Sequence, residues 1–436
     1  MTKVLHVRGG KALSGRVRIA GAKNAASKMM IASLLTEEEV ILDNCPQIEE
    51  MSITAEICAT VGAQVRRDGS RTVIHTPHIT NTKVTGLSRS NRLSILAISP
   101  LLHRAGRAEV PVVGGDKIGP RPVNFHLEIL KLMGAAIEES GDKYHAVAPK
   151  GGLHGALIIL PYPSVMATET AVLAATLATG RTRIENAAIE PEILDLIKLL
   201  QQMGAIVEIG ANRTVTIDGV HKLHKARYTV LPDRLEAASF ANIAIATGGE
   251  IEVEGARQDE LVTFLNTIRR IGADHEVNPE GIRFWGNPQK LVGIELETDT
   301  YPGFATDWQQ PLVVTLTQAK GISVVHETVF EDRFGYTEDL IRMGADIGVF
   351  AKCLGEVTCR FKNRSMRHSA VIKGPTPLRG TNIEIPDIRA GMAQVIAALV
   401  AEGESTLTGV HHLERGYEQL WNKLRAIGAD FELTDN

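Results

Sequence analysis

The sequence lacks several features that mark specialised classes of protein. Aromatic residues make up only 4% of the 436 residues, which provides no platform for stacking nucleic-acid bases. No apolar run approaches the ~18 residues that a membrane-spanning helix needs, and no secretory signal is recognisable after Met1. These absences predict a soluble, cytoplasmic protein that acts neither on nucleic acid nor in a membrane.

Cysteine is also scarce. The four cysteines, Cys45, Cys58, Cys353 and Cys359, form no C-x-x-C pair, and no spacing of Cys and His matches a metal-binding motif. We therefore expect neither a metal ion nor another cofactor. An excess of one charge is missing as well, because the net charge is −4 and the pI is near 6.4. Any site for an anion must therefore be built locally.

Glycine, by contrast, is abundant, and six glycines reveal an internal repeat. The pair Gly-Ala recurs at intervals of 72, 70, 68, 72 and 84 residues. Its glycines are Gly62, Gly134, Gly204, Gly272, Gly344 and Gly428. Six copies at so constant a spacing are not expected from composition, and the period indicates a chain built from repeated structural units.

Each unit combines helices and strands. It starts with an Ala- and Leu-rich helix, as at 166–178 and 392–401, which stops at a glycine suited to the left-handed conformation. A short alternating strand such as 251–254, a polar loop, a second helix that leads into Gly-Ala, and another strand pair follow. One unit cannot bury both helices, so we expect two domains of three units, facing each other across a ligand-binding cleft.

Polar and charged residues recur where each first helix begins. They are Lys23-Asn24, Asn91-Arg92, Ser164-Val165, Asp233-Arg234, Thr306-Asp307, and Asp387 with Arg389. Helix capping explains Ser164 and Asp233. It does not explain Lys23, Arg92 or Arg389, because cations oppose the dipole at a helix N-terminus. Cations at several equivalent helix starts predict a shared anion.

The loops before the second helices carry further charges. They are Asp116, Lys117, Arg121, Glu190, Glu192, Glu331, Arg333, Glu414 and Arg415. One such pair is usually a surface ion pair, but recurrence at one place in the repeat favours a functional role. The Gly- and Pro-rich segment 112–123 is either an exposed turn or a lid that carries Asp116 and Arg121 into the cleft.

The last repeat interval is 12 residues longer than the one before it. The additional residues lie between Phe350 and Lys373. They include Cys353, Cys359, Arg360, Lys362, Arg364, Arg367 and His368. We expect a solvated hairpin or loop here, and the alternative is an additional basic contact for a partner or an anionic ligand.

Six segments, taken together and in order, resemble one known family. They are Gly21–Ala26 (GAKNAA), Gly114–Val123 (GGDKIGPRPV), Glu185–Ala188 (ENAA), Leu231–Arg234 (LPDR), Glu327–Phe334 (ETVFEDRF) and Arg415–Glu418 (RGYE). They resemble the enolpyruvyl transferase family, and in particular its members that use UDP-N-acetylglucosamine as the acceptor. The resemblance runs from about Val4 to Leu433.

The resemblance implies an α/β fold of two inside-out barrels, with three of the six repeats in each. One domain would be residues 22–231 with the lid 112–123, and the other residues 1–21 with 232–436, including the insertion near 350–373. The implied reaction moves the enolpyruvyl group of phosphoenolpyruvate to the 3'-hydroxyl of UDP-N-acetylglucosamine. Phosphate leaves from a tetrahedral ketal, in the first committed step of peptidoglycan synthesis.

The resemblance also implies roles for individual residues. Phosphoenolpyruvate would be bound by Lys23, Asn24, Arg121, Arg333, Arg389 and Arg415. The nucleotide sugar would be bound by Arg92, Arg121, Pro122, Val123, Asn124, Ser164, Val165, Asp307 and Val329. Asp307 would be the general base, and Lys23 and Arg389 would stabilise the charges of the reacting phosphoenolpyruvate.

Asp116 occupies the lid position where many members of the family have a cysteine that reacts with fosfomycin. A carboxyl group there can serve as general acid if burial keeps it protonated. It is also a weaker nucleophile toward an epoxide than a thiolate. The sequence therefore predicts resistance to fosfomycin.

Four positions depart from the family pattern, all on the side of the acceptor. Leu96 stands in place of Trp, Tyr162 of Lys, Ile189 of Arg and Asn124 of Asp. We favour the interpretation that these four substitutions arose within one lineage of the same enzyme. The alternatives are an enolpyruvyl transferase for a different hydroxyl acceptor and a non-catalytic ligand-binding paralogue. The oligomeric state is not indicated.

Overall fold

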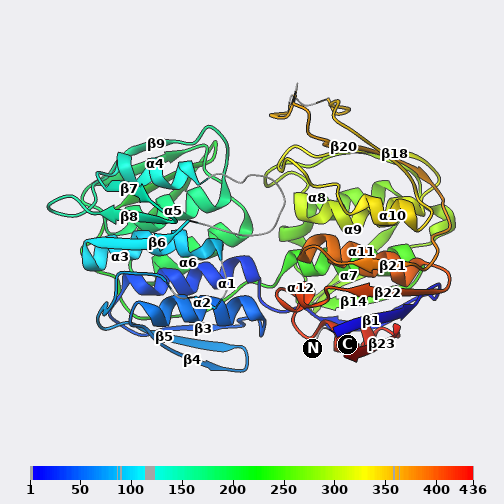
Figure 1. The fold of residues 1–436 in the computed structure, drawn as a ribbon, viewed down its shortest axis with the longest axis horizontal. Coiled ribbons are helices and arrows are strands. Elements are labelled where there is room, and N and C mark those ends of the chain that lie inside the picture. The colour runs from blue at the N-terminus through cyan, green and yellow to red at the C-terminus, as the bar shows by residue number, and fades with distance from the viewer. Residues whose placement is uncertain are drawn as a thin grey trace. The chain divides into compact units, whose positions relative to one another are not determined.

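The computed structural model describes residues 3–85, 87–88, 91–112, 123–356, 359–362 and 364–435. Two compact units divide the chain (Figure 1). We call the described part of 21–231 the central unit, and residues 3–20 with the described part of 232–435 the terminal unit. The chain therefore passes between the units after Ala20 and after Leu231.

Three small sheets and their helices make up the central unit. Its helices are α1 (Lys23–Ala32), α2 (Glu49–Thr60), α3 (Ile98–Ala105), α4 (Asn124–Leu132), α5 (Val165–Thr176) and α6 (Pro191–Gln202), with the 3₁₀ helices η1 (Ser33–Leu35) and η2 (Arg92–Ala97). Its strands are β3 (Val40–Asp43), β4 (Gln64–Asp68), β5 (Arg71–His75), β6 (Arg107–Pro111), β7 (Ala136–Ser140), β8 (Lys143–Val147), β9 (Leu157–Ile159), β10 (Arg181–Glu185), β11 (Ile206–Gly210), β12 (Thr214–Asp218) and β13 (Ala226–Thr229).

The terminal unit is built in the same way. Its helices are α7 (Arg234–Thr247), α8 (Gln258–Arg270), α9 (Thr306–Thr317), α10 (Thr337–Arg342), α11 (Ile388–Val400), α12 (His411–Glu414) and α13 (Leu420–Ala426), with η3 (Pro288–Lys290). Its strands are β1 (Lys3–Arg8), β2 (Ser14–Arg18), β14 (Glu250–Glu254), β15 (Asp274–Asn278), β16 (Gly281–Trp285), β17 (Glu295–Glu297), β18 (Gly321–His326), β19 (Asp346–Phe350), β20 (Ser369–Gly374), β21 (Asn382–Glu384), β22 (Glu404–Thr408) and β23 (Asp430–Asp435).

All six sheets follow one plan. Three antiparallel strands, such as β14-β16-β15 or β18-β20-β19, receive one parallel strand at the edge, here β2 and β17. In the sheet β6-β8-β7, a single parallel bridge from Lys83 to Glu109 takes the place of that strand. In the last sheet the middle strand is β1, between β22 and β23, so the start of the chain completes the sixth repeat.

The first helix of each repeat is buried on nearly all sides. In the terminal unit α7, α9 and α11 pack on one another, and Figure 1 shows them between β18 and β20 on one side and β22 and β1 on the other. Every residue of α11 except Val400 is buried. Such helices must be apolar all round, which explains why they are rich in Ala, Ile and Leu. The helices lie inside and the sheets outside, as the sequence predicts.

The recurring Gly-Ala pair is the end of each second helix. All six glycines have φ between +87° and +111°, a region that residues with a Cβ avoid. The alanine that follows closes the last turn, since the amide of Ala63 donates to the carbonyl of Cys58 at 3.0 Å. This C-terminal motif needs glycine at one position, which explains the period in the sequence.

The second repeat begins differently from the others. Its first helix starts as η2 and continues as α3 from Ile98. Pro100 has no amide hydrogen, and it lies in the first turn of α3, where an amide would have no partner within the helix. The proline therefore marks where α3 can begin. In the part of the chain that the structure describes, no helix is long and apolar enough to span a membrane.

Candidate functional site

The charged residues that the repeat places at helix starts do lie there. α1 begins at Lys23, followed by Asn24, and η2 begins at Arg92. Asp307 and Arg389 are the second residues of α9 and α11. These side chains stand where unpaired amides and the helix dipole favour anions.

Helix capping holds at two of these positions and fails at a third. The carboxylate of Asp233 accepts hydrogen bonds from the amides of Leu235 and Glu236, at 2.8 and 3.2 Å. Asp387 caps α11 in the same way. The expectation that Ser164 caps α5 is wrong, because its side chain makes no cap hydrogen bond. Its carbonyl instead accepts the hydroxyl of Thr168 at 2.8 Å.

A cluster of opposite charges surrounds Asp307 in the terminal unit. One carboxylate oxygen pairs with the guanidinium of Arg333, and the other accepts from Nε of Arg389 at 3.1 Å. The two arginine side chains are 4% and 10% exposed, and that of Asp307 is 21% exposed. Two guanidinium groups thus converge on one carboxylate. The arrangement is therefore suited to hold a further anion.

Tyr417 and Ser239 complete this cluster. The guanidinium of Arg389 donates to the Tyr417 hydroxyl at 3.3 Å, and that hydroxyl lies 3.0 Å from the Ser239 hydroxyl. Burial raises the pKa of Tyr417 against the opposing charge of Arg389, so the phenol is neutral at pH 7. Burial lowers the pKa of Arg389, but the charges of Asp307 and Asp233 and the hydrogen bond to Tyr417 outweigh burial and raise it. The arginine is thus firmly cationic.

Two further predicted residues flank this cluster along the chain. Val329 is buried, and its amide donates to the Glu327 carboxylate at 2.8 Å. Arg415 follows α12 directly, two residues before Tyr417. Tyr417 belongs to the RGYE segment, but no role was predicted for it from the sequence. Its position beside Arg415 was the signal that could have identified it.

In the central unit, Arg92 influences a buried histidine. His126 on α4 is 3% exposed, and its Nδ1 lies 2.7 Å from the hydroxyl of Thr170 on α5. Burial, with the charge of Arg92, lowers the pKa of His126 to about 3. His126 is therefore neutral at physiological pH. Arg92 carries the positive charge that, from the sequence, we expect to bind an anion.

Glu169 is a buried carboxyl group that the sequence did not single out. It lies on α5 and is 1% exposed. Burial raises its pKa to about 7, opposed by Lys28 and assisted by Glu190 and Glu192. The charges of Glu190 and Glu192 thus add to burial in favouring the protonated form of Glu169. An Ala-rich helix gave no periodic signal that could mark this residue as ionisable and buried.

The remaining predicted contacts lie at helix starts of the central unit. Val123 immediately precedes α4, Asn124 is its first residue, and Ser164 and Val165 occupy the same places at α5. Of the departures from the family pattern, Leu96 is fully buried within the core of this unit. Its side chain therefore serves packing, as an aliphatic residue can.

Backbone conformation explains why the Glu185–Ala188 segment contains an asparagine. Asn186 has φ of +56°, and the Nδ2 of its side-chain amide donates to the backbone carbonyl of Leu160 at 2.8 Å. Asparagine tolerates this left-handed conformation better than most residues. Asp116, Arg121 and Pro122, with segment 113–122 as a whole, lie outside the described residues, so the lid hypothesis stays a prediction.

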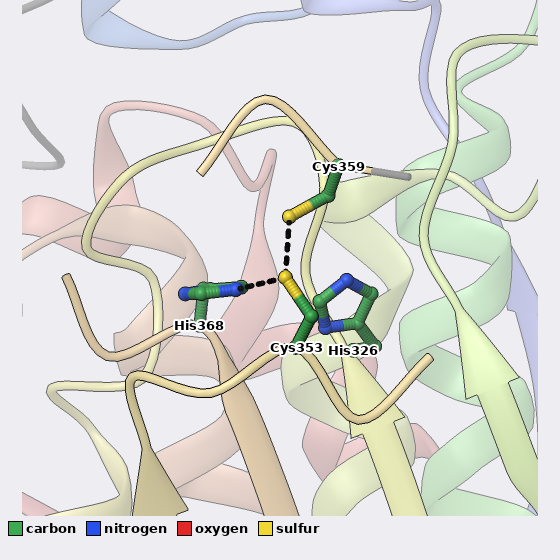
Figure 2. Close-up of side chains that lie close together, drawn as sticks. All are labelled: His326, Cys353, Cys359 and His368. Atoms are coloured by element: carbon green, nitrogen blue, oxygen red, sulfur yellow. Dashed lines mark hydrogen bonds between the residues drawn. The ribbon is translucent and has the colours of Figure 1, made fainter. Parts of the chain in front are cut away.

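The spacing of Cys and His predicted no metal site, but the fold brings four such residues together. The ligand atoms of His326, Cys353, Cys359 and His368 lie within 4.8 Å of one another (Figure 2). The sequence analysis missed this cluster because 27 residues separate His326 from Cys353. Only the pairing of β18 with β20 brings His326 next to His368, which precedes Ser369.

Known proteins resemble this chain over almost its whole length. A family model described as EPSP synthase (3-phosphoshikimate 1-carboxyvinyltransferase) matches residues 7–424. The UDP-N-acetylglucosamine 1-carboxyvinyltransferase of Protochlamydia amoebophila is 48% identical, covering 99% of this chain and 94% of the relative. The enzyme of the same name from Chlamydia abortus is 46% identical (98% and 97%), and that from Caulobacter vibrioides 41% (97% and 95%).

Solved structures share the architecture. The enolpyruvyl transferase NikO from Streptomyces tendae matches with a TM-score of 0.86 at 23% identity, covering 99% of both chains. EPSP synthase from Acinetobacter baumannii matches with a TM-score of 0.77 at 19% identity, covering 100% of both. At such identities these structures show the fold alone, and they confirm the fold that the resemblance implies.

Proposed function

The chain belongs to the EPSP synthase family of enolpyruvyl transferases, and from this membership we propose that it acts as a UDP-N-acetylglucosamine 1-carboxyvinyltransferase. It transfers the enolpyruvyl group of phosphoenolpyruvate to the 3'-hydroxyl of UDP-N-acetylglucosamine and releases phosphate. The activity belongs to peptidoglycan synthesis, and we propose a cytoplasmic location for the enzyme.

The reaction proceeds by addition and elimination. The acceptor oxygen bonds to C2 of phosphoenolpyruvate while C3 takes up a proton, which gives a tetrahedral ketal. The ketal then loses a proton from C3, and the C2–O bond to phosphate breaks. Each step needs a placed acid or base, worth ~10²–10⁴-fold in rate, and cations that stabilise phosphate and carboxylate.

For phosphoenolpyruvate, we assign binding to Lys23, Asn24, Arg121, Arg333, Arg389 and Arg415. The support is the convergence of two buried guanidinium groups, those of Arg333 and Arg389, on the Asp307 carboxylate. Planar guanidinium groups match both carboxylate and phosphate oxygens.

For the acceptor, we assign Asp307 as the general base. Its two oxygens contact Arg333 and Arg389, which places this carboxylate beside the cations assigned to phosphoenolpyruvate. The nucleotide sugar contacts are Arg92, Arg121, Pro122, Val123, Asn124, Ser164, Val165 and Val329. Asp116 is assigned as the general acid, and an Asp116→Asn enzyme with full activity would refute that role.

The identity to enzymes with this acceptor carries the proposal. Identity of 41–48% over nearly full length contrasts with 19% to a shikimate-phosphate enzyme of the same fold. The departures at Tyr162, Ile189 and Asn124 motivate the competing proposal of a different hydroxyl acceptor. Acceptor choice is therefore the point to test.

The test is phosphate release from phosphoenolpyruvate with UDP-N-acetylglucosamine, with shikimate 3-phosphate in a parallel assay. We expect release only with the nucleotide sugar, and mass spectrometry of the product should show the added enolpyruvyl group. Phosphoenolpyruvate binding without turnover by either acceptor would overturn the proposal in favour of another acceptor or a ligand-binding protein.

A further inference from the structure

Four potential metal ligands converge in the terminal unit, outside the residues assigned to the reaction. His326 ends β18, His368 immediately precedes β20, and Cys353 and Cys359 lie on the segment between β19 and β20. The sulfur of Cys353 is 3.2 Å from that of Cys359 and 3.3 Å from Nε2 of His368 (Figure 2). Both histidines are 0% exposed and Cys359 is 6% exposed, so the cluster is enclosed by protein.

The hydrogen bonds of Ser369 decide the tautomer of His326. The Ser369 hydroxyl donates to the carbonyl of Lys352 at 2.8 Å and accepts from the amide of Leu354. Its single hydrogen is thereby used, so the Nδ1 of His326, 2.8 Å away, must be the donor in their contact. Nε2 of His326 consequently carries a lone pair.

That lone pair is buried without a hydrogen-bond donor. Nε2 of His326 has no hydrogen-bond partner within the described ranges. A buried polar atom left in this way costs about 1–3 kcal/mol. In this cluster the neighbouring groups are the two sulfurs and the ring of His368, whose centroid is 5.1 Å away. A cation located among these groups would supply the missing partner.

His368 is oriented in the same sense. Its Nδ1 lies 2.7 Å from the carbonyl of Met366, which can only accept. Nδ1 therefore carries the hydrogen and Nε2 presents a lone pair toward Cys353. A hydrogen bond from Nδ1 to an oxygen is the usual support for a metal-binding histidine, and both histidines of the cluster have one.

We propose that His326, Cys353, Cys359 and His368 bind one Zn²⁺ ion. Two imidazole nitrogens and two thiolates are a typical ligand set for structural zinc. Zn–S bonds of ~2.3 Å and Zn–N bonds of ~2.0–2.1 Å in a tetrahedron place ligand atoms roughly 3.3–3.8 Å apart. Ligand atoms that all lie within 4.8 Å of one another reach this geometry with small side-chain adjustments.

The site fastens the insertion to the sheet β17-β18-β20-β19. Gly355 of the insertion packs so closely that a Cβ there would come 2.6 Å from the His326 ring. Beyond the cluster, Arg360 donates to the carbonyl of Val329 and lies 3.6 Å from Glu331. The ion thus orders a segment that supports the loop between β18 and α10.

Metal content tests this proposal directly. The full chain is purified without a histidine tag under reducing conditions, stripped with a chelator and titrated with Zn²⁺ or Co²⁺. We expect one Zn²⁺ per chain, and with Co²⁺ the intense visible bands of tetrahedral coordination together with thiolate charge transfer. Cys353→Ser and Cys359→Ser should each abolish the charge-transfer intensity or reduce it about twofold, and lower zinc affinity at least a hundredfold.

Cys45→Ala, a buried cysteine of the central unit, is the matched control and should retain full stoichiometry. The proposal is overturned if the wild-type chain binds less than a tenth of an equivalent of Zn²⁺. It is equally overturned if the Cys353 and Cys359 variants bind as the wild type does, or if mass spectrometry shows these two cysteines joined in a disulfide in the reduced preparation. The wild-type cobalt spectrum does not depend on the folding of any variant.

Discussion

In the central unit burial shifts the pKa values of ionisable groups toward their neutral forms, whereas the terminal unit gathers such groups into clusters of direct contacts. In the central unit, Glu169 and His126 lie in the core with pKa values shifted to about 7 and about 3. In the terminal unit, Asp307 is held by two arginines, and four metal-type ligands meet at the insertion. The two units share one sheet plan, so the repeat supplies a scaffold and the differences supply the chemistry.

Isolated and gathered groups have different physical consequences. A single buried ionisable group lowers stability at any pH where its charged form prevails. A group with partners keeps its charge and can bind a ligand. The comparison therefore predicts that substitutions in the terminal clusters change activity or metal binding, while substitutions of Glu169 change mainly the pH dependence of stability.

Asp307→Asn should have the largest effect. The amide cannot accept a proton, and it no longer balances the charges of Arg333 and Arg389. We expect kcat for phosphate release to fall by ~10²–10⁴-fold. Asp274→Asn removes a surface carboxylate that pairs with Arg269 and is the matched control. If the kcat of Asp307→Asn were within threefold of the wild-type value, Asp307 would not be the general base.

Replacement of Asp116 by cysteine tests the chemistry of the lid position. The wild-type enzyme should keep its activity after incubation with fosfomycin, because a carboxylate is a poor nucleophile toward the epoxide. Asp116→Cys should become inactivated with time, with a covalent adduct at residue 116 visible by mass spectrometry. Rapid inactivation of the wild type, with an adduct at Asp116, would contradict the prediction.

Removal of the metal should expose the insertion to protease. Lys352, Arg360 and Lys362 are trypsin sites within it. Local opening becomes about tenfold more frequent for each 1.4 kcal/mol of stabilisation lost. We expect cleavage between 351 and 368 to be at least tenfold faster in chelator-treated protein, and zinc to restore protection. Equal rates with and without zinc would show that the cluster does not fasten the segment.

Glu169→Gln should produce the smallest effect, confined to the pH dependence of stability between about pH 4.5 and 7. The pKa of Glu169 in the folded chain, about 7, lies above the ordinary glutamate pKa of 4.5. The contribution of Glu169 is therefore fully favourable below pH 4.5 and is lost as pH rises through 7, by up to roughly 3 kcal/mol. The urea midpoint of the variant should fall less steeply than that of the wild type between pH 5 and 8.

Glu185→Gln is the control for that comparison, since Glu185 is a partly exposed partner of Arg183. Its urea midpoint should follow the wild type across the same pH range. If Glu169→Gln also followed the wild type, the carboxyl group would have to be ionised in the folded chain without a stability penalty. The contrast between isolated and gathered groups would then fail.

The sequence by itself determined the architecture. Glycine is needed at each positive-φ helix end, so Gly62 and its five counterparts had to recur, and their period disclosed six units. The apolar first helices and the charges at Lys23, Arg92 and Arg389 followed from the same alignment of repeats. Local conformational rules act on neighbouring residues, and for that reason they can be read along the chain.

Only the tertiary structure decided which side chains meet. Asp307 and Arg389 are 82 residues apart, and His326 is 42 residues from His368. Sheet pairing and helix packing fix such contacts, and neither leaves a signature in local spacing. Ser164 shows the converse, because a residue type suited to capping makes no cap hydrogen bond in the folded chain. Burial likewise set the ionisation of Glu169, since a pKa depends on what surrounds a group in space.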